Sequence, residues 1–272
     1  MTMELAEFCK LFDIRQVKIN VGNLLNDDVR SRLQADRFAI VRNVVPTELI
    51  YELQAVWLRI LSGERRFSSN LQYGEENYTY DFFGKYVRHF AFYWNPPTCQ
   101  LSYELSLLLH YCRNILTGYD PMYGLTMKPD RTGIYLAATH YGAGTGEMTV
   151  HVDPNYFLPV HYNLPLSFHG DDYEAGGLQI HRPVGVENID EQVRPGDLLL
   201  FDGALPHSVA KVMGKGRKSS IGRLQLFAVP TQFKEEGKRS FFKEAAWRIY
   251  GRYRYFLQSH GIGLRSDHKN FR

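Results

Sequence analysis

Three side chains in the middle of this sequence have the types and the spacing of a divalent-metal site. His151 and Asp153 lie two positions apart in the run Thr-Val-His-Val-Asp, and His207 comes much later. Alternate residues of an extended strand point to one face, so His151 and Asp153 can approach the same ion. His207 follows the apolar run Gly-Asp-Leu-Leu-Leu-Phe-Asp and begins another, so it can supply a third ligand from a different strand. Two imidazoles and one carboxylate suit Fe(II) and leave one side of an octahedron free.

Other histidines compete for this role. His169 and Asp171 form a second His-x-Asp pair, but they lie in a Gly-Asp-Asp turn, where no pleat fixes the side-chain directions. His140, His161 and His181 have no carboxylate two positions later, so we expect them at most to support the ligands or line a pocket. Taken alone, a His-x-Asp pair is also compatible with ordinary core or surface histidines.

The elements that must position these ligands are short and rich in β-formers. From residue 132 onward such runs alternate with turn signals, including Gly-Ala-Gly, Asp-Pro-Asn and Arg-Pro-Gly-Asp. The pattern predicts an all-β sandwich or barrel rather than βαβ units. The expected strands are 134–139, 148–152, 158–164, 177–182, 198–202, 207–212 and 219–229.

Helical patterns flank this β-rich part on both sides. Apolar residues at helical spacing predict four helices, over 25–35, 47–60, 101–116 and 235–259. Asn26 or Asp27 is expected to cap the first helix. Thr47 is expected to cap the second, and Gly63 to end it. Short strands are expected at 17–20 and 38–42. With no linker or repeat, we predict a single domain over 1–272, with a helical N-terminal support (1–130), a core (131–231) and a C-terminal helix (232–272).

An aromatic stretch between 67 and 97 has no clear periodicity. Its rings either wall or cover a substrate pocket, or pack the helices onto the barrel, and the sequence leaves both interpretations open. Arg88 and Arg131 are the cations that we would test for contacts with a substrate carboxylate. The aromatic residues concerned are Tyr73, Tyr78, Tyr80, Phe82, Phe83, Tyr86 and Phe90.

Composition excludes several classes of protein. The chain has 272 residues, 44% of them hydrophobic and 22% charged, which is typical of a globular domain. A net charge of +3, with no strong basic groove pattern, does not indicate nucleic-acid binding. No run approaches the ~18 apolar residues of a membrane span, and the first residues lack a signal-peptide pattern. Cys9, Cys99 and Cys112 are odd in number and widely spaced, so we expect no disulfides and a cytoplasmic protein.

The residues after His207 extend the pattern. Arg217 lies ten residues later (217 − 207 = 10) and is followed by Ser219. The order of His-x-Asp, a distal His and Arg-x-Ser resembles the Fe(II)/2-oxoglutarate-dependent oxygenase superfamily, and more closely its isopenicillin N synthase-like and plant-type branch. The resemblance covers roughly 134–230, and more weakly the runs Val-Lys-Ile-Asn-Val-Gly-Asn-Leu and Arg-Phe-Ala-Ile-Val-Arg-Asn-Val-Val-Pro.

This resemblance implies a fold and a set of cofactors. The fold is mainly β with flanking helices, around a double-stranded β-helix (jelly-roll, cupin-like) core. The cofactors and cosubstrates are Fe(II), 2-oxoglutarate and O2, and the iron is held by a facial triad. The triad residues would be His151, Asp153 and His207.

Charge supports a cation near the cosubstrate. Fe(II) with two neutral imidazoles and Asp153 keeps one positive charge, and a bound 2-oxoglutarate dianion would make the site negative by one. An arginine supplies both the charge and a bidentate geometry for the far carboxylate. If the strand is continuous, Arg217 and Ser219 share one face, and Arg223, the alternative anchor, lies on it too. The resemblance adds Tyr141, a strand-end tyrosine, although its neighbours depart from the family motif.

We therefore expect a dioxygenase that hydroxylates a small organic molecule, with release of succinate and CO2. An amino acid derivative or an intermediate of natural-product biosynthesis is the expected substrate, and a peptide stays open. A related iron oxidase that catalyses desaturation, epimerisation or ring closure is the alternative among enzymes. A non-catalytic jelly-roll binding module is the alternative from another class. No partner other than the small molecule is indicated, and the sequence does not predict the oligomeric state.

Overall fold

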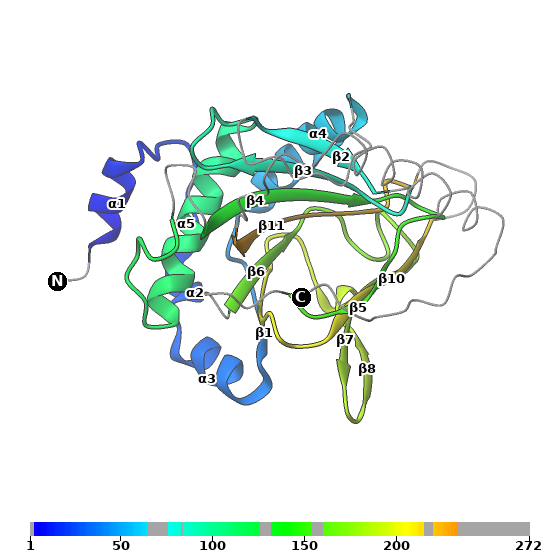
Figure 1. The fold of residues 1–272 in the computed structure, drawn as a ribbon. Helices are drawn as coiled ribbons and strands as arrows, with labels where there is room; N and C mark the ends of the chain where they lie inside the picture. Colours follow the sequence, from blue (N-terminus) through cyan, green and yellow to red (C-terminus); the bar gives the residue numbers. More distant parts are fainter. Residues whose placement is uncertain are drawn as a thin grey trace, which may run out of the picture.

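Two antiparallel β-sheets carry most of the chain in the computed structural model, which describes residues 3–64, 76–82, 84–125, 132–153, 160–214 and 220–232. The large sheet has the strand order β1-β9-β6-β11-β4-β3-β2, and the small sheet has the order β5-β10-β7-β8 (Figure 1). The strands are β1 Phe38–Val41, β2 Tyr78–Asp81, β3 Val87–Phe92, β4 Thr132–Tyr141, β5 Met148–His151, β6 Val160–Pro165, β7 Ala175–Arg182, β8 Gly185–Asn188, β9 Leu198–Asp202, β10 His207–Met213 and β11 Arg223–Gln232.

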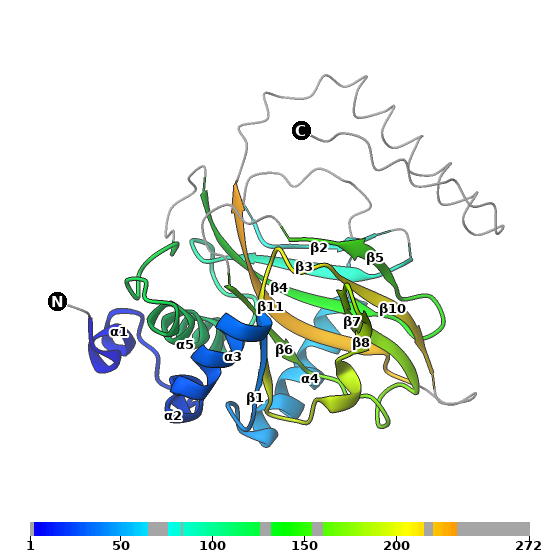
Figure 2. The same ribbon diagram turned by 90° about the horizontal axis from the view of Figure 1, so that it is seen from below.

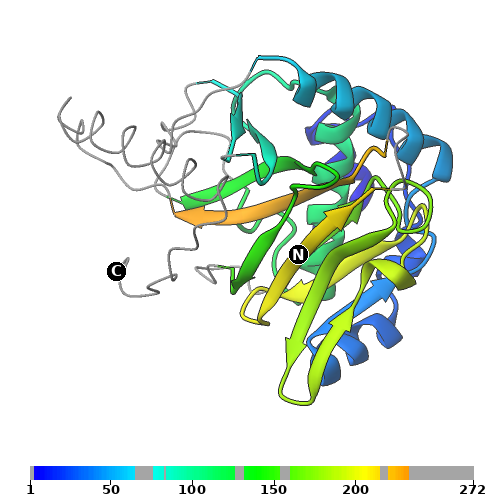
Figure 3. The same ribbon diagram turned by 90° about the vertical axis from the view of Figure 1, so that its right-hand side faces the viewer.

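From β4 onward the chain crosses repeatedly between the two sheets. Strands β4, β6, β9 and β11 belong to the large sheet, whereas β5, the β7–β8 hairpin and β10 belong to the small one. The two sheets face each other (Figure 3), and Tyr141 of β4 packs in one cluster with Val209 and Val212 of β10. Side chains on the inner faces of both sheets are therefore brought together between them.

Helices cover the outer face of the large sheet. Helices α3 Asp27–Asp36, α4 Thr47–Ser62 and α5 Gln100–Leu116 contact this sheet, and α1 Leu5–Leu11 and α2 Val21–Leu24 pack against α5. A short 3-10 turn, η1 Asp190–Gln192, contacts β7 of the small sheet instead. Helix α4 contacts β3 and β4, and α5 contacts β6 and β11 (Figure 2). The buried Trp57 of α4 donates a hydrogen bond of 2.7 Å to Ser102 of α5. Because helices cover one face and the small sheet the other, β4 is buried from 134 to 141, with only His140 half-buried.

The aromatic stretch supplies the inner face of the large sheet. Tyr78 pairs with Phe90 across β2 and β3, and Phe92 pairs with Tyr135 of β4, so these rings share one face. They form a buried cluster with Tyr80 and Ala137. The opposite face of β3 packs against the helices. On that face the ring of His89 lies 5.3 Å, between centroids, from the ring of Trp57 in α4. The described part of the stretch thus walls the space between the sheets, while the positions 67–75 and 83 lie outside the described residues.

A buried ion pair ties β11 to the small sheet. Arg223, 1% exposed, donates to Asp190 through Nε at 2.5 Å and Nη2 at 3.2 Å. Asp190 also accepts from the Tyr173 hydroxyl at 2.6 Å and from the Leu178 amide at 3.0 Å. Gly177, at φ +101°, makes room, because a β-carbon there would lie 2.2 Å from Asp190 Oδ2. Burial alone would raise the pKa of Asp190, but the charge and hydrogen bonds of Arg223 hold it below its usual value.

Most expected strands are present, with shifted ends. Strand β8 was not expected, and neither were β2 and β3, which lie within the segment 1–130. Residues 17–20 form no strand, which corrects that expectation. Helix α4 begins at Thr47 after the N-cap residue Pro46, so Thr47 is not the cap. The expected C-terminal helix 235–259 lies outside the described residues.

One correction bears on the site. The expected strand 219–229 starts only at Arg223, and Gly222 just before it has φ +90°. A residue in the left-handed region interrupts the alternation of a strand. The continuous strand that would place Arg223 on one face with Ser219 is therefore not present, because residues 220–222 are not in a strand.

No helix in the described ranges has the length and apolar character needed to cross a lipid bilayer.

Substitution of Asp190 tests the buried ion pair. In Asp190→Asn the shape is kept while Arg223 loses its counter-ion, so we expect the free energy of unfolding to fall by about 3–5 kcal/mol. Asp28→Asn, which breaks the exposed Arg32–Asp28 pair, is the control and should cost less than about 1 kcal/mol. Urea denaturation of both variants measures the difference, and equal losses would contradict this role of Asp190.

The same pair predicts a pH dependence. A carboxyl with a lowered folded pKa stabilises the protein above its unfolded pKa, about 3.9 for aspartate, and loses this effect as pH falls through the folded value. The stability difference between wild type and Asp190→Asn should thus be constant near neutral pH and shrink only in acid. A difference that already shrinks between about pH 8 and about pH 6, where histidine titrates, would assign it to another group.

Candidate metal centre

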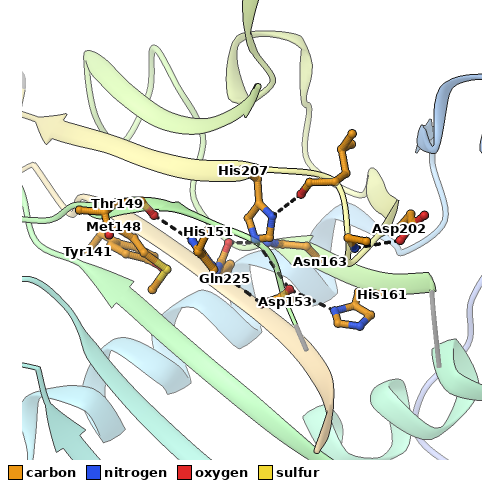
Figure 4. Close-up of polar contacts among 12 residues, drawn as sticks. Tyr141, Met148, Thr149, His151, Asp153, His161, Asn163, Asp202, His207 and Gln225 are labelled. Atoms are coloured by element: carbon orange, nitrogen blue, oxygen red, sulfur yellow. Dashed lines mark hydrogen bonds and ion pairs between the residues drawn. The ribbon is translucent and has the colours of Figure 1, made fainter. Parts of the chain in front are cut away.

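Two paired strands and one turn bring His151, Asp153 and His207 together. His151 ends β5 and lies directly opposite His207, the first residue of β10. Residues opposite each other in an antiparallel pair project to the same side, and here both rings face inward, with centroids 4.3 Å apart. Asp153 follows two residues later, where its amide donates to Gly203 O at 2.8 Å. The three side chains converge between the sheets (Figure 4).

Backbone contacts fix the tautomers of both histidines. Nδ1 of His151 lies 2.8 Å from Thr149 O, and Nδ1 of His207 lies 2.9 Å from Leu205 O. A carbonyl oxygen can only accept, so both Nδ1 atoms carry a proton, and in the neutral rings both Nε2 atoms carry a lone pair. Both Nε2 atoms face Asp153. The Nε2 atom of His151 lies 3.8 Å from Asp153 Oδ1, and the Nε2 atom of His207 lies 3.7 Å from Asp153 Oδ2.

This arrangement fits a divalent cation. One ligand atom from each of the three residues lies within 4.8 Å of the others, and no other group of this kind occurs in the part of the chain that the structure describes. Two lone pairs and a carboxylate directed at one another repel unless a positive charge lies between them. A metal ligated by Nε2, with Nδ1–H held by a carbonyl, is the usual arrangement for histidine.

The environment of Asp153 favours its charged form. Burial alone would raise the pKa of Asp153, but the hydrogen bond from His161, and the positive charge of the histidines around it when they are protonated, hold it below its usual value. His161 Nδ1 donates to Asp153 Oδ2 at 3.1 Å and is only 2% exposed. Burial lowers the pKa of His207, with Asp153 opposing the effect. An ionised carboxylate and a neutral imidazole are the states that bind a metal.

A glycine allows this support. In the turn after β9, a β-carbon at Gly203 would lie 2.9 Å from the His161 ring and 3.3 Å from Asp153 Cβ. The imidazole of His161 and the side chain of Asp153 therefore occupy the space that any other residue at position 203 would need.

The competing histidines lie elsewhere. His169 packs edge-on against Tyr173 in its turn, and Asp171 is exposed. His140 contacts Ile221 O at 2.6 Å, and His181 contacts the Ser208 hydroxyl at 2.8 Å. Of these alternatives, His161 is the one that touches a candidate ligand.

The proposed anchors of the cosubstrate have different placements. Arg217 and Ser219 lie outside the described residues, and so does Arg131. Arg223 is engaged by Asp190, so its charge is already neutralised. Tyr141 is buried between the sheets, with its ring 5.4 Å from that of Tyr86. Burial raises the pKa of Tyr141 to about 12, although Arg88 opposes the effect, so its hydroxyl keeps its proton at neutral pH.

Two polar residues of the inner face were missed from the sequence. Asn163 of β6 donates to Gln225 of β11 at 2.6 Å, and both are buried (Figure 4). Asn163 Oδ1 and His161 Nε2 have no hydrogen-bond partner among the described residues. A signal for Asn163 was available, because polar residues at positions 161 and 163 interrupt an otherwise apolar expected strand at period two.

Comparisons with known proteins support the fold. No protein-family model and no curated protein sequence matches the chain. Among solved structures, a Pseudomonas putida prolyl-4-hydroxylase shares 17% identity, with 78% of this chain and 99% of that chain covered and a TM-score of 0.51. EctD from S. alaskensis, solved with 2-oxoglutarate and 5-hydroxyectoine, shares 12% identity over 84% and 86% of the two chains, with a TM-score of 0.51. A full-length Neurospora crassa protein, solved with alpha-KG and 5-formyluracil, shares 12% identity over 79% and 83%, also at 0.51.

Removal of His161 tests how Asp153 is held. His161→Ala deletes the only side-chain hydrogen bond that the structure gives Asp153 from the described residues. Loss of such a supporting contact typically weakens metal binding by about 10–100-fold. Anaerobic titration with Fe(II) measures the affinity, and His169→Ala serves as the control because that histidine lies outside the cluster. Equal affinity of His161→Ala and wild type would contradict the positioning role.

Proposed function

We propose that this protein is an Fe(II)- and 2-oxoglutarate-dependent oxygenase that hydroxylates a small organic molecule and releases succinate and CO2. The observation that carries the proposal is the convergence of two imidazole Nε2 atoms and one carboxylate between two sheets. When bound there, iron and 2-oxoglutarate supply the oxidising chemistry. The protein residues hold the ion, orient the ligands and restrict the access of water.

The proposed iron ligands are His151, Asp153 and His207. Two imidazoles and one carboxylate on one side of the ion form the facial triad of non-haem iron oxygenases and leave positions open for 2-oxoglutarate and O2. Solved structures with a similar fold support this choice, since two of them are described as complexes with 2-oxoglutarate or alpha-KG, two names for one compound.

The proposed fold is a double-stranded β-helix, or jelly roll. The support is the alternation of β4 to β11 between two facing antiparallel sheets, with the candidate ligands on β5, β10 and the segment after β5. Membership in the isopenicillin N synthase-like branch rests on the Arg217-x-Ser219 spacing in the sequence. All three cysteines are free, which agrees with the reducing cytoplasm that we keep as the expected location.

Arg217, with Ser219, is the proposed anchor of the far carboxylate of 2-oxoglutarate. Arg223 was the alternative, but its guanidinium already forms a buried pair with Asp190, and its Nη1 donates to Gln225. Recruiting Arg223 would leave Asp190 buried and unpaired, which is costly. Tyr141, protonated at neutral pH and placed on the inner face, is suited to donate a hydrogen bond to the same ligand.

The substrate is proposed to be a small molecule because the inner face near the site is a compact wall of rings. An amino acid derivative or a natural-product intermediate fits such a space. Desaturation, epimerisation or ring closure at the same centre are alternative outcomes of the reaction. A non-catalytic jelly-roll binding module would bind Fe(II) but form no succinate.

Two substitutions test the assignment of roles. Asp153→Ala should abolish 2-oxoglutarate-dependent succinate formation, whereas Arg217→Ala should mainly raise the 2-oxoglutarate concentration needed. A lost charge-assisted contact corresponds to about a 10–100-fold weaker cosubstrate affinity. Succinate release measured with a panel of metabolites, and without substrate, provides the readout.

The control is Lys10→Ala, a change in helix α1. Succinate formation by Asp153→Ala at the wild-type rate would refute the metal assignment. If Arg217→Ala is silent and Arg223→Ala, shown to be folded, raises the 2-oxoglutarate requirement, the anchor is Arg223. Stoichiometric Fe(II) binding without any succinate would favour the binding module.

A further inference from the structure

Arg88 lies on the inner face of the large sheet, on β3, the strand next to the edge strand β2. It pairs across the strands with Tyr80 of β2 and Thr139 of β4, so it lies on the face that carries the aromatic rings and Tyr141. Its Nε donates to Thr139 Oγ1 at 2.8 Å, and Thr139 is fully buried. This bond fixes the guanidinium plane. The Tyr135 and Tyr141 side chains are further hydrogen-bond partners of Arg88, so neutral hydroxyl groups, and no carboxylate, accompany its charge.

Aromatic rings surround the guanidinium. Its central carbon lies 4.9–5.9 Å from the centroids of four rings, a distance at which a cation is attracted to a ring face. The rings belong to Phe82, Tyr86, Phe90 and Phe227. They surround a half-buried charged group with mostly apolar side chains.

Arg88 forms no ion pair with a carboxylate within the described ranges, unlike the fully buried Arg223, which has Asp190. The acid whose charge acts on Arg88 is Asp153, a candidate iron ligand. Burial alone would lower the pKa of Arg88, but the neighbouring tyrosines and Asp153 raise it, so it keeps its charge. A cation in an apolar setting is costly unless an anion accompanies it.

If iron and 2-oxoglutarate occupy the site as proposed, the sum of the charges around Arg88 indicates what its counter-ion is. Iron and Asp153 together carry one positive charge, and 2-oxoglutarate changes this to one negative charge. Arg217 then brings the sum to zero. Arg88 adds one positive charge that nothing in this set balances, so the occupied interior has room for one further negative charge.

The polar groups nearby agree with a polar ligand in this space. Gln225 pairs with Thr139 across β11 and β4, and Asn163 donates to Gln225. Asn163 Oδ1 is buried on this face, with no hydrogen-bond partner in the described ranges. Buried polar atoms are nearly always satisfied by protein, water or a ligand.

We propose that Arg88 binds a carboxylate of the organic substrate, distinct from the carboxylates of 2-oxoglutarate. The substrate is then a small organic acid. Its carboxylate lies against the terminal nitrogens of Arg88, and its apolar part packs on the surrounding rings. This inference rests on the proposed function, since the charge count assumes iron and 2-oxoglutarate in the site.

Binding of a simple acid and its neutral amide tests the proposal. The anaerobic protein with Fe(II) and 2-oxoglutarate is titrated in a calorimeter with 3-phenylpropionate or 3-phenylpropanamide. Wild type should bind the acid more tightly than the amide by about tenfold or more, as expected for a charge-assisted contact. Arg88→Gln should abolish this preference, and Arg88→Lys should keep part of it.

Two further variants control for indirect effects. Thr139→Val removes the acceptor of Arg88 Nε while keeping the charge, so the preference for the acid should weaken without loss of amide binding. Arg59→Gln changes an exposed arginine of α4 and should behave as wild type. Circular dichroism verifies that each variant is folded.

The affinity for 2-oxoglutarate is measured from the charge-transfer band of its iron complex. This measurement distinguishes the proposed role of Arg88 in substrate binding from the proposed dependence of the enzyme on 2-oxoglutarate. The band should titrate equally in wild type and Arg88→Gln. If Arg88→Gln weakens 2-oxoglutarate binding and leaves the acid preference intact, Arg88 anchors the cosubstrate and the proposal is overturned. Equal binding of acid and amide by wild type also overturns it. Absence of the band in wild type would refute the proposed function instead.

Discussion

The structure depends on one electrostatic constraint, in which two imidazole lone pairs and a carboxylate face each other between the sheets. Carbonyl groups hold both Nδ1 protons outward, so the Nε2 atoms of His151 and His207 meet Asp153 without a proton between them. Only a cation makes this arrangement favourable. The direct pairing of β5 with β10 and the close turn at Gly203 both serve to keep it in place.

Two arginines of the large sheet show how the fold separates structural from ligand-binding charge. Arg223 is neutralised by Asp190 and joins β11 to the small sheet, so its role is to hold the two layers together. Arg88 is held by Thr139 and by rings, with no carboxylate bound to it among the described residues. The two arginines thus differ in whether the protein supplies the counter-ion, and that difference is the reason for assigning Arg88 to a ligand.

Features of the structure that depend on residues close together in the sequence were predicted from local sequence patterns. The period of two placed His151 and Asp153 on one face, and apolar runs located β4, β9 and β10. Helical spacing likewise found α4 and α5. The turn around His169 was correctly distinguished from a strand, because pleating, not residue type, sets side-chain direction.

Long-range pairing could not be predicted in this way. Asp190 meets Arg223 across 33 residues, and no local pattern in the sequence joins them. The short strands β2 and β3 were missed because β3 carries two neighbouring polar residues, Arg88 and His89, on opposite faces, so polar and apolar residues do not alternate along it. The expected continuity of Ser219 with Arg223 failed at Gly222, whose positive φ no periodicity shows.

The central claim is that the three convergent side chains hold Fe(II) in a form that binds 2-oxoglutarate. Anaerobic titration of the Fe(II) protein with 2-oxoglutarate, monitored in the visible spectrum, tests it most directly. We expect a metal-to-ligand charge-transfer band that saturates at one equivalent of 2-oxoglutarate per bound iron and is absent in Asp153→Ala. Tight binding of Fe(II) with no such band in the wild-type protein would contradict it.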